Sequence, residues 1–422
     1  MRTLSMTLIV AALLSGCSQS PGPTGGTPQT PEDAGVTPEE PLPSGPPVPT
    51  GPPNVPEFQP AFSGQTRVPA IQTKTAFQVT ELASGFRNPW AIAFLPDGRM
   101  LVTEKPTGAL YIVTPQGAKS PAVAGLPPVD GRGQGGLLDV EVGPDYAQSQ
   151  LIYWTYYEPR QGGNGLAVAR AKLVAGEQPR VENVQVIFRQ QPTFDSKLHF
   201  GSRLVFAPDG KLFITLGERS VPESRVKSQD VSTTFGKVVR INADGSIPKD
   251  NPLVGKGKAL PEIWSYGHRN IQSATLDAQG RLWTVEHGPR GGDELNRPEP
   301  GKNYGWPVIT YGVEYSGQPV GQGVTSQAGL EQPRYYWDPV IGPSGMALYT
   351  GDKFTGWQGN LLIGGLVSEG IVRLVMEGDR VTAEEWIPLD ARTRDVKVGP
   401  DGAVYVVTDE RDGKVLRVLP AR

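Results

Sequence analysis

"RLVFAPDGKLFITLGE", residues 203–218, has the residue pattern of an antiparallel β-hairpin. Two short apolar stretches, at 204–206 and 212–214, flank the sequence Pro208-Asp209-Gly210, which is typical of a tight turn. The pattern therefore predicts two short strands that pair with each other.

Five further segments follow the same plan of strand, turn and strand. They are "WAIAFLPDGRMLVTE" (90–104), "LLDVEVGPDYAQSQLIYWTYY" (137–157), "SATLDAQGRLWTVEHG" (273–288), "GMALYTGDKFTGWQGNLLIGG" (345–365) and "RDVKVGPDGAVYVVTDE" (394–410). Apolar stretches at 108–113, 237–241, 371–375 and 414–418 predict third strands. The turns recur at an irregular spacing of about 60 residues, and no convincing amphipathic helical pattern separates them.

Six such units predict an all-β fold, a six-bladed β-propeller, over residues 74–422. A propeller removes exposed strand edges by closing its ring, so "FQVTELA" (77–83) is expected to complete the last blade. A β-sandwich or two smaller β domains is the alternative, because sandwiches also contain short, regularly spaced strands.

The N-terminus predicts an exported protein. Residues 1–17 combine Arg2, the apolar stretch "MTLIVAALL" and "LSGC", which resembles the lipobox of bacterial lipoproteins, with Cys17 as the lipidated residue. An ordinary secretory signal is the alternative. Residues 18–73 are dominated by Pro, Gly, Thr, Ser and Glu, which predicts a disordered tether between a membrane and the folded domain. The chain's formal charge of −3 gives no reason to expect nucleic-acid binding.

Functional residues of a propeller usually lie in loops that converge at one end of its central channel, and the unusual residues of this chain lie mostly in such loops. "GQGGLLD" (133–139), "EIWSYGHRN" (262–270), "EHGPRGGDE" (286–294), "GKNYGWP" (301–307) and "RDVKVGPDG" (394–402) together resemble the aldose sugar dehydrogenases of the glucose/sorbosone dehydrogenase family. This resemblance extends over about 75–420. It implies oxidation of an aldose at its anomeric carbon by pyrroloquinoline quinone (PQQ), with electrons passed to an external quinone or redox protein.

The resemblance places the catalytic base at His199, and imidazole suits this role because it titrates near neutrality. A solvent-exposed turn histidine is the alternative. Glu218 would orient the imidazole, unless it is a surface carboxylate at a strand edge. Arg269 and Asn270 match residues that hold the quinone oxygens, and Arg269 would stabilise negative charge on the reduced cofactor. A structural arginine that bridges blades is the alternative for Arg269.

The remaining cofactor contacts are also implied by the resemblance. Arg392 and Arg394 alternate along one extended segment, so both side chains should lie on one face and could bind the carboxylates of PQQ. Gln134 and Tyr315 match further contacts. The alternatives are an amide that only belongs to a glycine-rich loop for Gln134 and an exposed strand aromatic for Tyr315. Val367 stands where the family commonly has Lys, so a cationic contact with the quinone is lost there.

Calcium is the metal that the resemblance implies. The carbonyls of Gly288 and Pro289 would bind the Ca²⁺ that also contacts PQQ, and Glu294 with Tyr304 matches a second, structural calcium site. His268 and His287 are interpreted as residues that pack loops or support the residues of the site, and not as metal ligands. One Cys and three His cannot form a zinc cluster.

Two other functions remain open. Six-bladed propellers also include calcium-dependent lactone hydrolases, whose metal would require several side-chain carboxylates at the central channel. A non-catalytic, tethered propeller that binds a glycan or a protein is the second alternative, but it leaves the histidine and the three arginines without a role.

Overall fold

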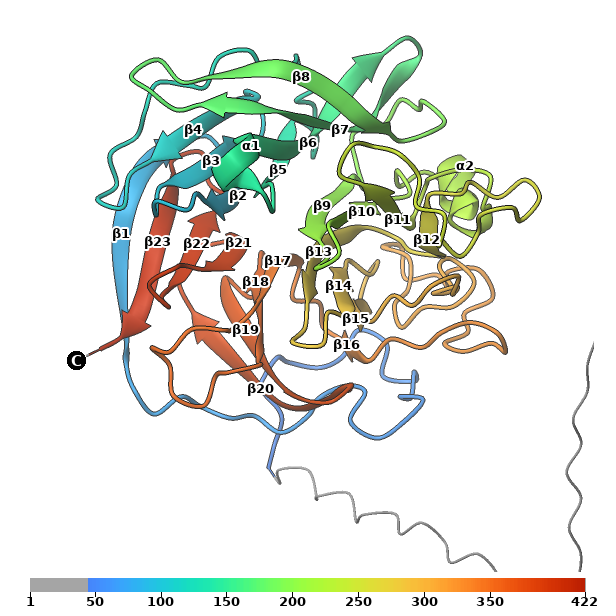
Figure 1. Cartoon of the computed structure of the whole chain (residues 1–422). Coiled ribbons are helices and arrows are strands. Elements are labelled where there is room, and N and C mark those ends of the chain that lie inside the picture. Colours follow the sequence, from blue (N-terminus) through green and yellow to red (C-terminus); the bar gives the residue numbers. More distant parts are fainter. Residues whose placement is uncertain (1–44, 422) are drawn as a thin grey trace, which may run out of the picture. The chain divides into compact units, whose positions relative to one another are not determined.

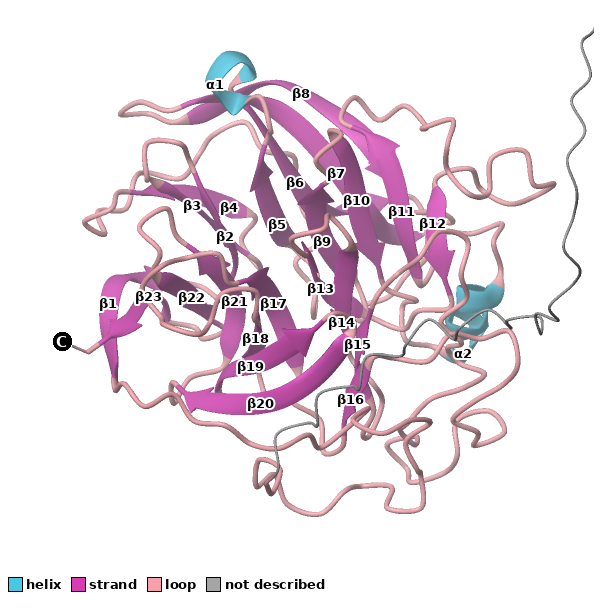
Figure 2. Cartoon of the chain, turned by 60° about the horizontal axis from the view of Figure 1, so that its bottom comes forward, coloured by secondary structure: helices cyan, strands magenta, loops and turns pink. Residues whose placement is uncertain are grey.

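Six antiparallel sheets surround a common centre in the computed structural model, which describes residues 45–421 (Figure 1). We number the sheets as blades 1 to 6 in the chain order of their innermost strands. This arrangement confirms the predicted all-β, six-bladed propeller. Strands account for almost all regular structure in the described chain, and each helix has only four residues (Figure 2).

Blade 1 consists of β2 (Pro89–Phe94), β3 (Met100–Glu104) and β4 (Ala109–Val113). Blade 2 consists of β5 (Leu137–Val142), β6 (Leu151–Arg160), β7 (Gly163–Val174) and β8 (Arg180–Arg189). Blade 3 consists of β9 (Gly201–Phe206), β10 (Lys211–Leu216), β11 (Lys237–Asn242) and β12 (Ile263–Tyr266). Blade 4 consists of β13 (Ile271–Leu276), β14 (Leu282–Glu286), β15 (Asp293–Asn296) and β16 (Tyr335–Trp337). Blade 5 consists of β17 (Pro343–Leu348), β18 (Leu361–Gly365), β19 (Gly370–Glu377) and β20 (Arg380–Pro388). Blade 6 consists of β21 (Thr393–Val398), β22 (Val404–Thr408), β23 (Gly413–Pro420) and β1 (Phe77–Phe86). The short helices are α1 (Tyr146–Ser149), α2 (Pro222–Arg225) and η1 (Val226–Gln229).

The hairpin at 203–218 forms as predicted. Leu212 of β10 pairs with Phe206 of β9, and Ile214 pairs with Leu204. The ring is closed by β1, which pairs antiparallel with β23 from Phe77 opposite Pro420. The first strand of the domain therefore completes the last blade, as the sequence predicted for 77–83.

Threonines in the second strands tie neighbouring blades together. Thr155 of β6 accepts a hydrogen bond from the Asp139 N–H at 2.8 Å and donates one to the Ser202 carbonyl of blade 3 at 3.0 Å. Thr103 in blade 1 and Thr215 in blade 3 repeat this arrangement toward the blades that follow them. The repeated bonds satisfy polar groups that would otherwise be buried without a partner.

Arg203 of β9 connects four blades at the centre of the ring. Its guanidinium forms ion pairs with Asp139 of blade 2 at 2.8 Å and with Asp395 of blade 6 at 3.2 Å. It also lies 4.5 Å from the ring centroid of Trp90 in blade 1. Only 2% of Arg203 is exposed, so this charge cluster is buried.

Residues 45–73, which composition alone assigns to a disordered tether, pack against blades 4 and 5 (Figure 1). Ala70 bridges to Glu384 of β20, and the fully buried Gln65 donates a hydrogen bond to the Pro333 carbonyl at 2.9 Å. We call this segment the strap. The apolar residues Val55 and Val68 are buried between its prolines. Composition could not reveal this packing, because the partner surface comes from a distant part of the chain.

Asp338 is the main polar anchor of the strap. Its carboxylate accepts hydrogen bonds from the N–H and the side-chain amide of Asn54, at 2.9 and 2.8 Å, and from the Val55 N–H at 2.9 Å. We expect Asp338→Ala to lower the free energy of unfolding by about 1–3 kcal/mol, because buried donors lose their acceptor. Urea denaturation would measure this loss. The exposed Asp352, changed to Ala, is the matched control, and an equal effect of both variants would contradict the anchor.

Cys17 and the predicted lipobox lie outside the described residues. Among residues 45–421, the structure contains no helix with the length and apolar character needed to cross a membrane.

Candidate active site

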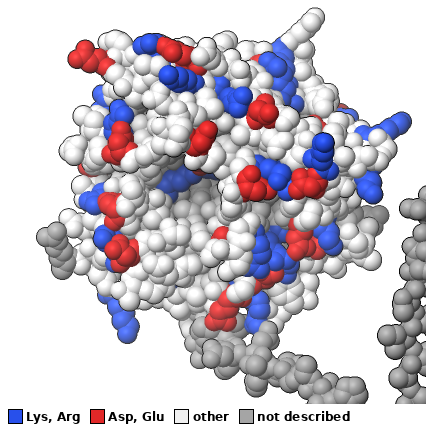
Figure 3. Space-filling view, viewed as in Figure 1, with Lys and Arg blue, Asp and Glu red and all other residues white. Residues whose placement is uncertain are grey.

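A cavity of about 460 Å³ lies where loops and strand ends of all six blades meet. Figure 3 shows a hollow over the centre of the ring, with basic side chains on its wall. Seven of the residues predicted to bind the cofactor or a metal line the cavity: Gln134, Asn270, Gly288, Pro289, Tyr315, Arg392 and Arg394. His199, Glu218 and Arg269 lie beside it and are not part of its lining. Residues from five separate loops are thus brought together at one site.

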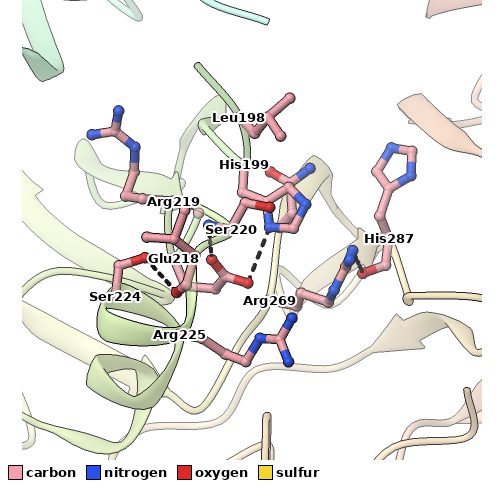
Figure 4. Close-up of polar contacts among 12 residues, drawn as sticks. Leu198, His199, Glu218, Arg219, Ser220, Ser224, Arg225, Arg269 and His287 are labelled. Carbon is pink, nitrogen blue, oxygen red and sulfur yellow. Dashed lines mark hydrogen bonds and ion pairs between the residues drawn. The ribbon is translucent and has the colours of Figure 1, made fainter. Parts of the chain in front are cut away.

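His199 and Glu218 form a buried pair beside the cavity. His199 Nδ1 lies 3.0 Å from Glu218 Oε1, and only 7% of His199 and none of Glu218 is exposed. His199 is therefore not a solvent-exposed turn histidine, and Glu218 is not a surface carboxylate, which were the alternatives that the sequence left open. In Figure 4 the second ring nitrogen points away from Glu218, and it has no hydrogen-bond partner among the described residues.

Burial and the neighbouring Arg269 lower the pKa of His199 below its ordinary value of 6.5, although Glu218 acts in the opposite direction. Burial would raise the pKa of Glu218, but His199, Arg269 and the Ser220 N–H together outweigh burial and lower it. The pair therefore combines a neutral imidazole with an ionised carboxylate near neutral pH. A neutral imidazole so oriented can accept a proton at its free nitrogen.

Glycines at positions 201 and 217 are required where the His199 turn packs against the end of β10. His199 has φ +50° and Gly201 has φ +67°, both in the left-handed region. A Cβ atom on Gly201 would lie 2.6 Å from the Gly217 nitrogen, and one on Gly217 would lie 2.1 Å from the His199 carbonyl. The small residues thus let the turn pack against β10 of its own blade, which fixes the imidazole over Glu218.

Arg269 and Asn270 begin blade 4 and face the His199 turn. The Arg269 guanidinium donates to the His287 carbonyl at 3.0 Å, while its Nε is buried without a partner in the described chain (Figure 4). Asn270 Oδ1 accepts a hydrogen bond from the Gly201 N–H at 3.0 Å. Its side-chain NH₂ makes no hydrogen bond to a described residue. Arg269 therefore does not serve only to bridge blades, because it retains an unused donor.

Arg394 of β21 and Arg392, which directly precedes this strand, both line the cavity. Arg394 forms an ion pair with Asp409 and donates to Gln272 Oε1 at 3.2 Å. Burial would raise the pKa of Asp409, but Arg394 and then Lys105 outweigh it and lower the pKa to about 2. Asp409 is therefore an anion throughout the physiological range, and it neutralises only part of the positive charge.

Sequence reasoning missed three polar residues of the cavity wall, Lys105, Gln272 and Asp409, and it interpreted a fourth, His287, as a residue that packs a loop or supports the site. Lys105, His287 and Asp409 each follow directly after the second strand of a blade. That position repeats in every unit, so the repeat itself could have identified them. His287 is half-buried beside Arg269. Desolvation first and then the charge of Arg269 lower the pKa of His287 to about 3, which keeps the ring neutral.

The loop after β14 offers main-chain oxygens to a cation. The Gly288 and Pro289 carbonyls accept no hydrogen bond from the described residues. Asp293 Oδ1 accepts a hydrogen bond from the Gly288 N–H at 2.8 Å, and its Oδ2 accepts two further N–H groups. Within residues 45–421, no three His, Cys, Asp or Glu side chains gather as a metal site, so a cation there would depend on carbonyls.

Glu294 and Tyr304 lie outside the cavity, in a buried cluster with Glu286, His268 and Asn296. Asn296 donates to both carboxylates, at 2.9 Å to Glu286 and 3.2 Å to Glu294, but its own Oδ1 is buried without a partner among the described residues. The His268 ring contacts Glu286 at 2.9 Å and stacks on Tyr304. Burial, Glu286 and Asp293 raise the pKa of Glu294 well above its ordinary value. His268 is thus held by Ser265, Glu286 and Tyr304 and does not reach the cavity.

Tyr315 and Val367 form part of the cavity rim, where Tyr315 is 73% exposed and Val367 is 58% exposed.

The Tyr304 hydroxyl is already used in hydrogen bonds, since it donates to the Arg297 carbonyl and accepts the Glu299 N–H at 2.9 Å. Only the main-chain carbonyl of Tyr304 thus remains for a cation.

Residues 86–417 match the model of the glucose/sorbosone dehydrogenase family. An aldose sugar dehydrogenase of Escherichia coli is 44% identical over 339 residues, which cover 79% of this chain and 90% of that protein. A crystal structure of a glucose dehydrogenase is 46% identical, with a TM-score of 0.78 over 82% of this chain and all of that chain.

A PQQ-bound aldose sugar dehydrogenase of Streptomyces coelicolor is 26% identical, with a TM-score of 0.67, over 82% of this chain and all of that chain. The family match spans five complete blades and most of the sixth, and it includes every residue of the site described above. The chain therefore belongs to the glucose/sorbosone dehydrogenase family and is a sugar oxidoreductase.

Proposed function

We propose that this protein oxidises aldose sugars at the anomeric carbon to the lactone, with PQQ as cofactor and an external electron acceptor. The observation that carries the proposal is the buried His199–Glu218 pair beside a basic cavity. The PQQ-bound relative of Streptomyces coelicolor and a quinoprotein glucose dehydrogenase of Acinetobacter calcoaceticus, 27% identical over 81% of this chain, support the choice of cofactor.

The polar groups of the cavity fit PQQ. Arg394 lies on the cavity wall and Arg269 lies beside the cavity, and the Nε atom of each is a buried donor without a partner among the described residues. Two guanidinium groups suit an anion with several carboxylates. Arg392 and Arg394 would hold carboxylates, while Arg269 and Asn270 would donate to the quinone oxygens, with Gln134 and Tyr315 at the edge of the site. When bound, PQQ would supply the two-electron acceptor for the hydride of the sugar.

His199 is the residue that would move the proton. Its free ring nitrogen would accept the proton of the anomeric hydroxyl, and Glu218 would hold the ring in one tautomer and stabilise the imidazolium. The positive charge of Arg269 would stabilise negative charge that develops beside it during oxidation. The buried position of the pair limits competition from water.

The loop 288–293 fits Ca²⁺, a hard cation that prefers oxygen ligands. The Gly288 and Pro289 carbonyls would bind it at the cavity, where no described N–H uses them. A second Ca²⁺ at Glu294 and the Tyr304 carbonyl would compensate the adjacent carboxylates of Glu286 and Glu294, and it would give the buried Asn296 Oδ1 a partner.

We expect removal of Ca²⁺ to abolish sugar oxidation and to lower the unfolding temperature. A metal that binds only the folded state stabilises it by mass action, by about 2.7 kcal/mol at 100 times its Kd. Dye reduction and thermal unfolding before and after chelation would measure both effects. Glu294→Gln should lose most of the calcium-dependent stability while Ca²⁺ still binds at the cavity. Full activity after elemental analysis has confirmed metal removal would contradict a calcium requirement.

Reconstitution tests the proposed function. Purified protein would be mixed with PQQ and Ca²⁺, and dye reduction followed with a panel of aldoses. We expect reduction that depends on PQQ and on the sugar. Lactone hydrolysis without PQQ would favour the hydrolase alternative, and the absence of any turnover would favour a binding propeller. Few acidic residues face the cavity, which weighs against the hydrolase.

We further propose that Cys17 anchors the protein to a membrane after export. The motif "LSGC" after an apolar stretch supports this location. Several acyl chains on one cysteine would hold the protein stably, whereas one chain would not.

A further inference from the structure

One side of the cavity carries more positive charge than its own carboxylate can neutralise. Lys105 of blade 1 and Arg392 and Arg394 of blade 6 line it together with Asp409. Three cations and one anion leave a net charge of +2 on this wall. Blades 1 and 6 are neighbours across the ring closure, so these groups come from opposite ends of the propeller sequence.

The three cations differ in how far they are already paired. Arg394 is engaged with Asp409 and Gln272, and Arg392 donates to the Leu366 carbonyl at 2.9 Å and lies 3.9 Å from Asp409. The Lys105 ammonium makes no hydrogen bond and no ion pair with any described residue. It is therefore the cation of this wall with the most capacity for an added anion.

The main chain fixes Lys105 firmly at the cavity. Its N–H donates to the Asn88 carbonyl at 3.2 Å, and its own carbonyl accepts the Leu137 N–H of blade 2 at 3.0 Å. A Cβ atom on Gly136 would lie 1.8 Å from that carbonyl, so blade 2 packs directly against it. The Lys105 side chain therefore starts from a fixed point of the cavity wall.

Partial burial beside Arg394 and Arg392 also makes the charge of Lys105 costly in the free protein. Burial, followed by repulsion from Arg394 and Arg392, lowers the pKa of Lys105, and Asp409 offsets this only in part. An anion placed between these cations would remove that repulsion. Val367, the neutral rim residue, offers no competing charge.

We propose that Lys105 is a third cationic ligand of the cofactor and binds one of its carboxylates beside Arg392 and Arg394. This inference rests on the proposed function, because it takes PQQ as the anion. Lys105 thereby supplies a cationic contact with the cofactor in a chain whose Val367 stands where the family commonly has Lys.

Calorimetric titration of the Ca²⁺-loaded protein with PQQ tests the assignment by binding rather than by activity. We expect Lys105→Met, which keeps the length of the side chain, to raise the Kd about tenfold to a hundredfold, the range of a lost charge-assisted contact. Lys105→Arg keeps the charge and should bind within severalfold of wild type. Lys256→Met, at an exposed lysine that does not line the cavity, is the matched control and should leave the Kd unchanged.

The possible failures are distinguishable. A wild-type protein that does not bind PQQ would overturn the proposed function and this assignment together. Wild-type binding with an unchanged Kd in Lys105→Met would overturn the assignment alone. An equal loss in Lys105→Arg and Lys105→Met would also overturn it, because a charge contact should survive the first change. Thermal unfolding of each variant would show that it is folded.

Discussion

Replacing His199 with alanine is expected to slow reduction of bound PQQ by aldose by about 10²–10⁴-fold, the usual contribution of a positioned general base. His199 is buried and held by Glu218 at 3.0 Å, so its removal deletes the proton acceptor without exposing a new surface. Stopped-flow single-turnover reduction would measure the rate. Binding of PQQ and Ca²⁺ should change little, because the cofactor contacts come from other residues.

Reoxidation by dye is the internal control, since it requires no base for the sugar hydroxyl. The pH profile is a second readout. The lowered pKa of His199 means that its basic form persists below pH 6.5, so the acid limb of the wild-type rate should lie below that value. A variant reduced within severalfold of the wild-type rate would show that His199 is only a turn residue.

Replacing Arg203 with methionine is expected to lower the free energy of unfolding by about 3–5 kcal/mol, because two buried carboxylates lose their partner. Arg203 pairs with Asp139 and Asp395 from two other blades, and all three are at most 2% exposed. Burial already raises the pKa of Asp139 to about 7 with Arg203 present, so its ionised form depends on that guanidinium. Denaturant unfolding would measure the loss.

Arg99→Met is the matched control, since Arg99 pairs with Asp97 at the surface. Such exposed pairs contribute at most about 1 kcal/mol, and many contribute nothing measurable. If the two variants lost equal stability, Arg203 would not be the central link between blades. The stability of the ring would then depend on other contacts between the blades.

The fold could be predicted from the sequence because each blade is local. Strand, turn and strand follow one another within about 20 residues, so apolar alternation and turn residues suffice to define the hairpins. Closure by β1 could also be inferred, because a propeller leaves an unpaired edge unless its ring is closed. The strap could not, since Asp338 and the strap residues that it binds are more than 280 positions apart.

The site was only partly predictable for the same reason. Arg392 and Arg394 reach the same cavity because they alternate along one short segment at the start of β21, which the sequence shows directly. Lys105 and Asp409 were missed because each looks like an ordinary polar residue at the end of a hairpin. Only the ring closure, which places blade 1 beside blade 6, brings these residues to one wall.

Anaerobic mixing of the PQQ- and Ca²⁺-loaded protein with one equivalent of an aldose tests the central claim most directly. The absorbance of the bound cofactor and the products in solution would be followed in the same sample. We predict stoichiometric reduction of the cofactor together with one equivalent of the sugar lactone. An unchanged cofactor spectrum with the aldose recovered intact, across a panel of aldoses, would contradict the account.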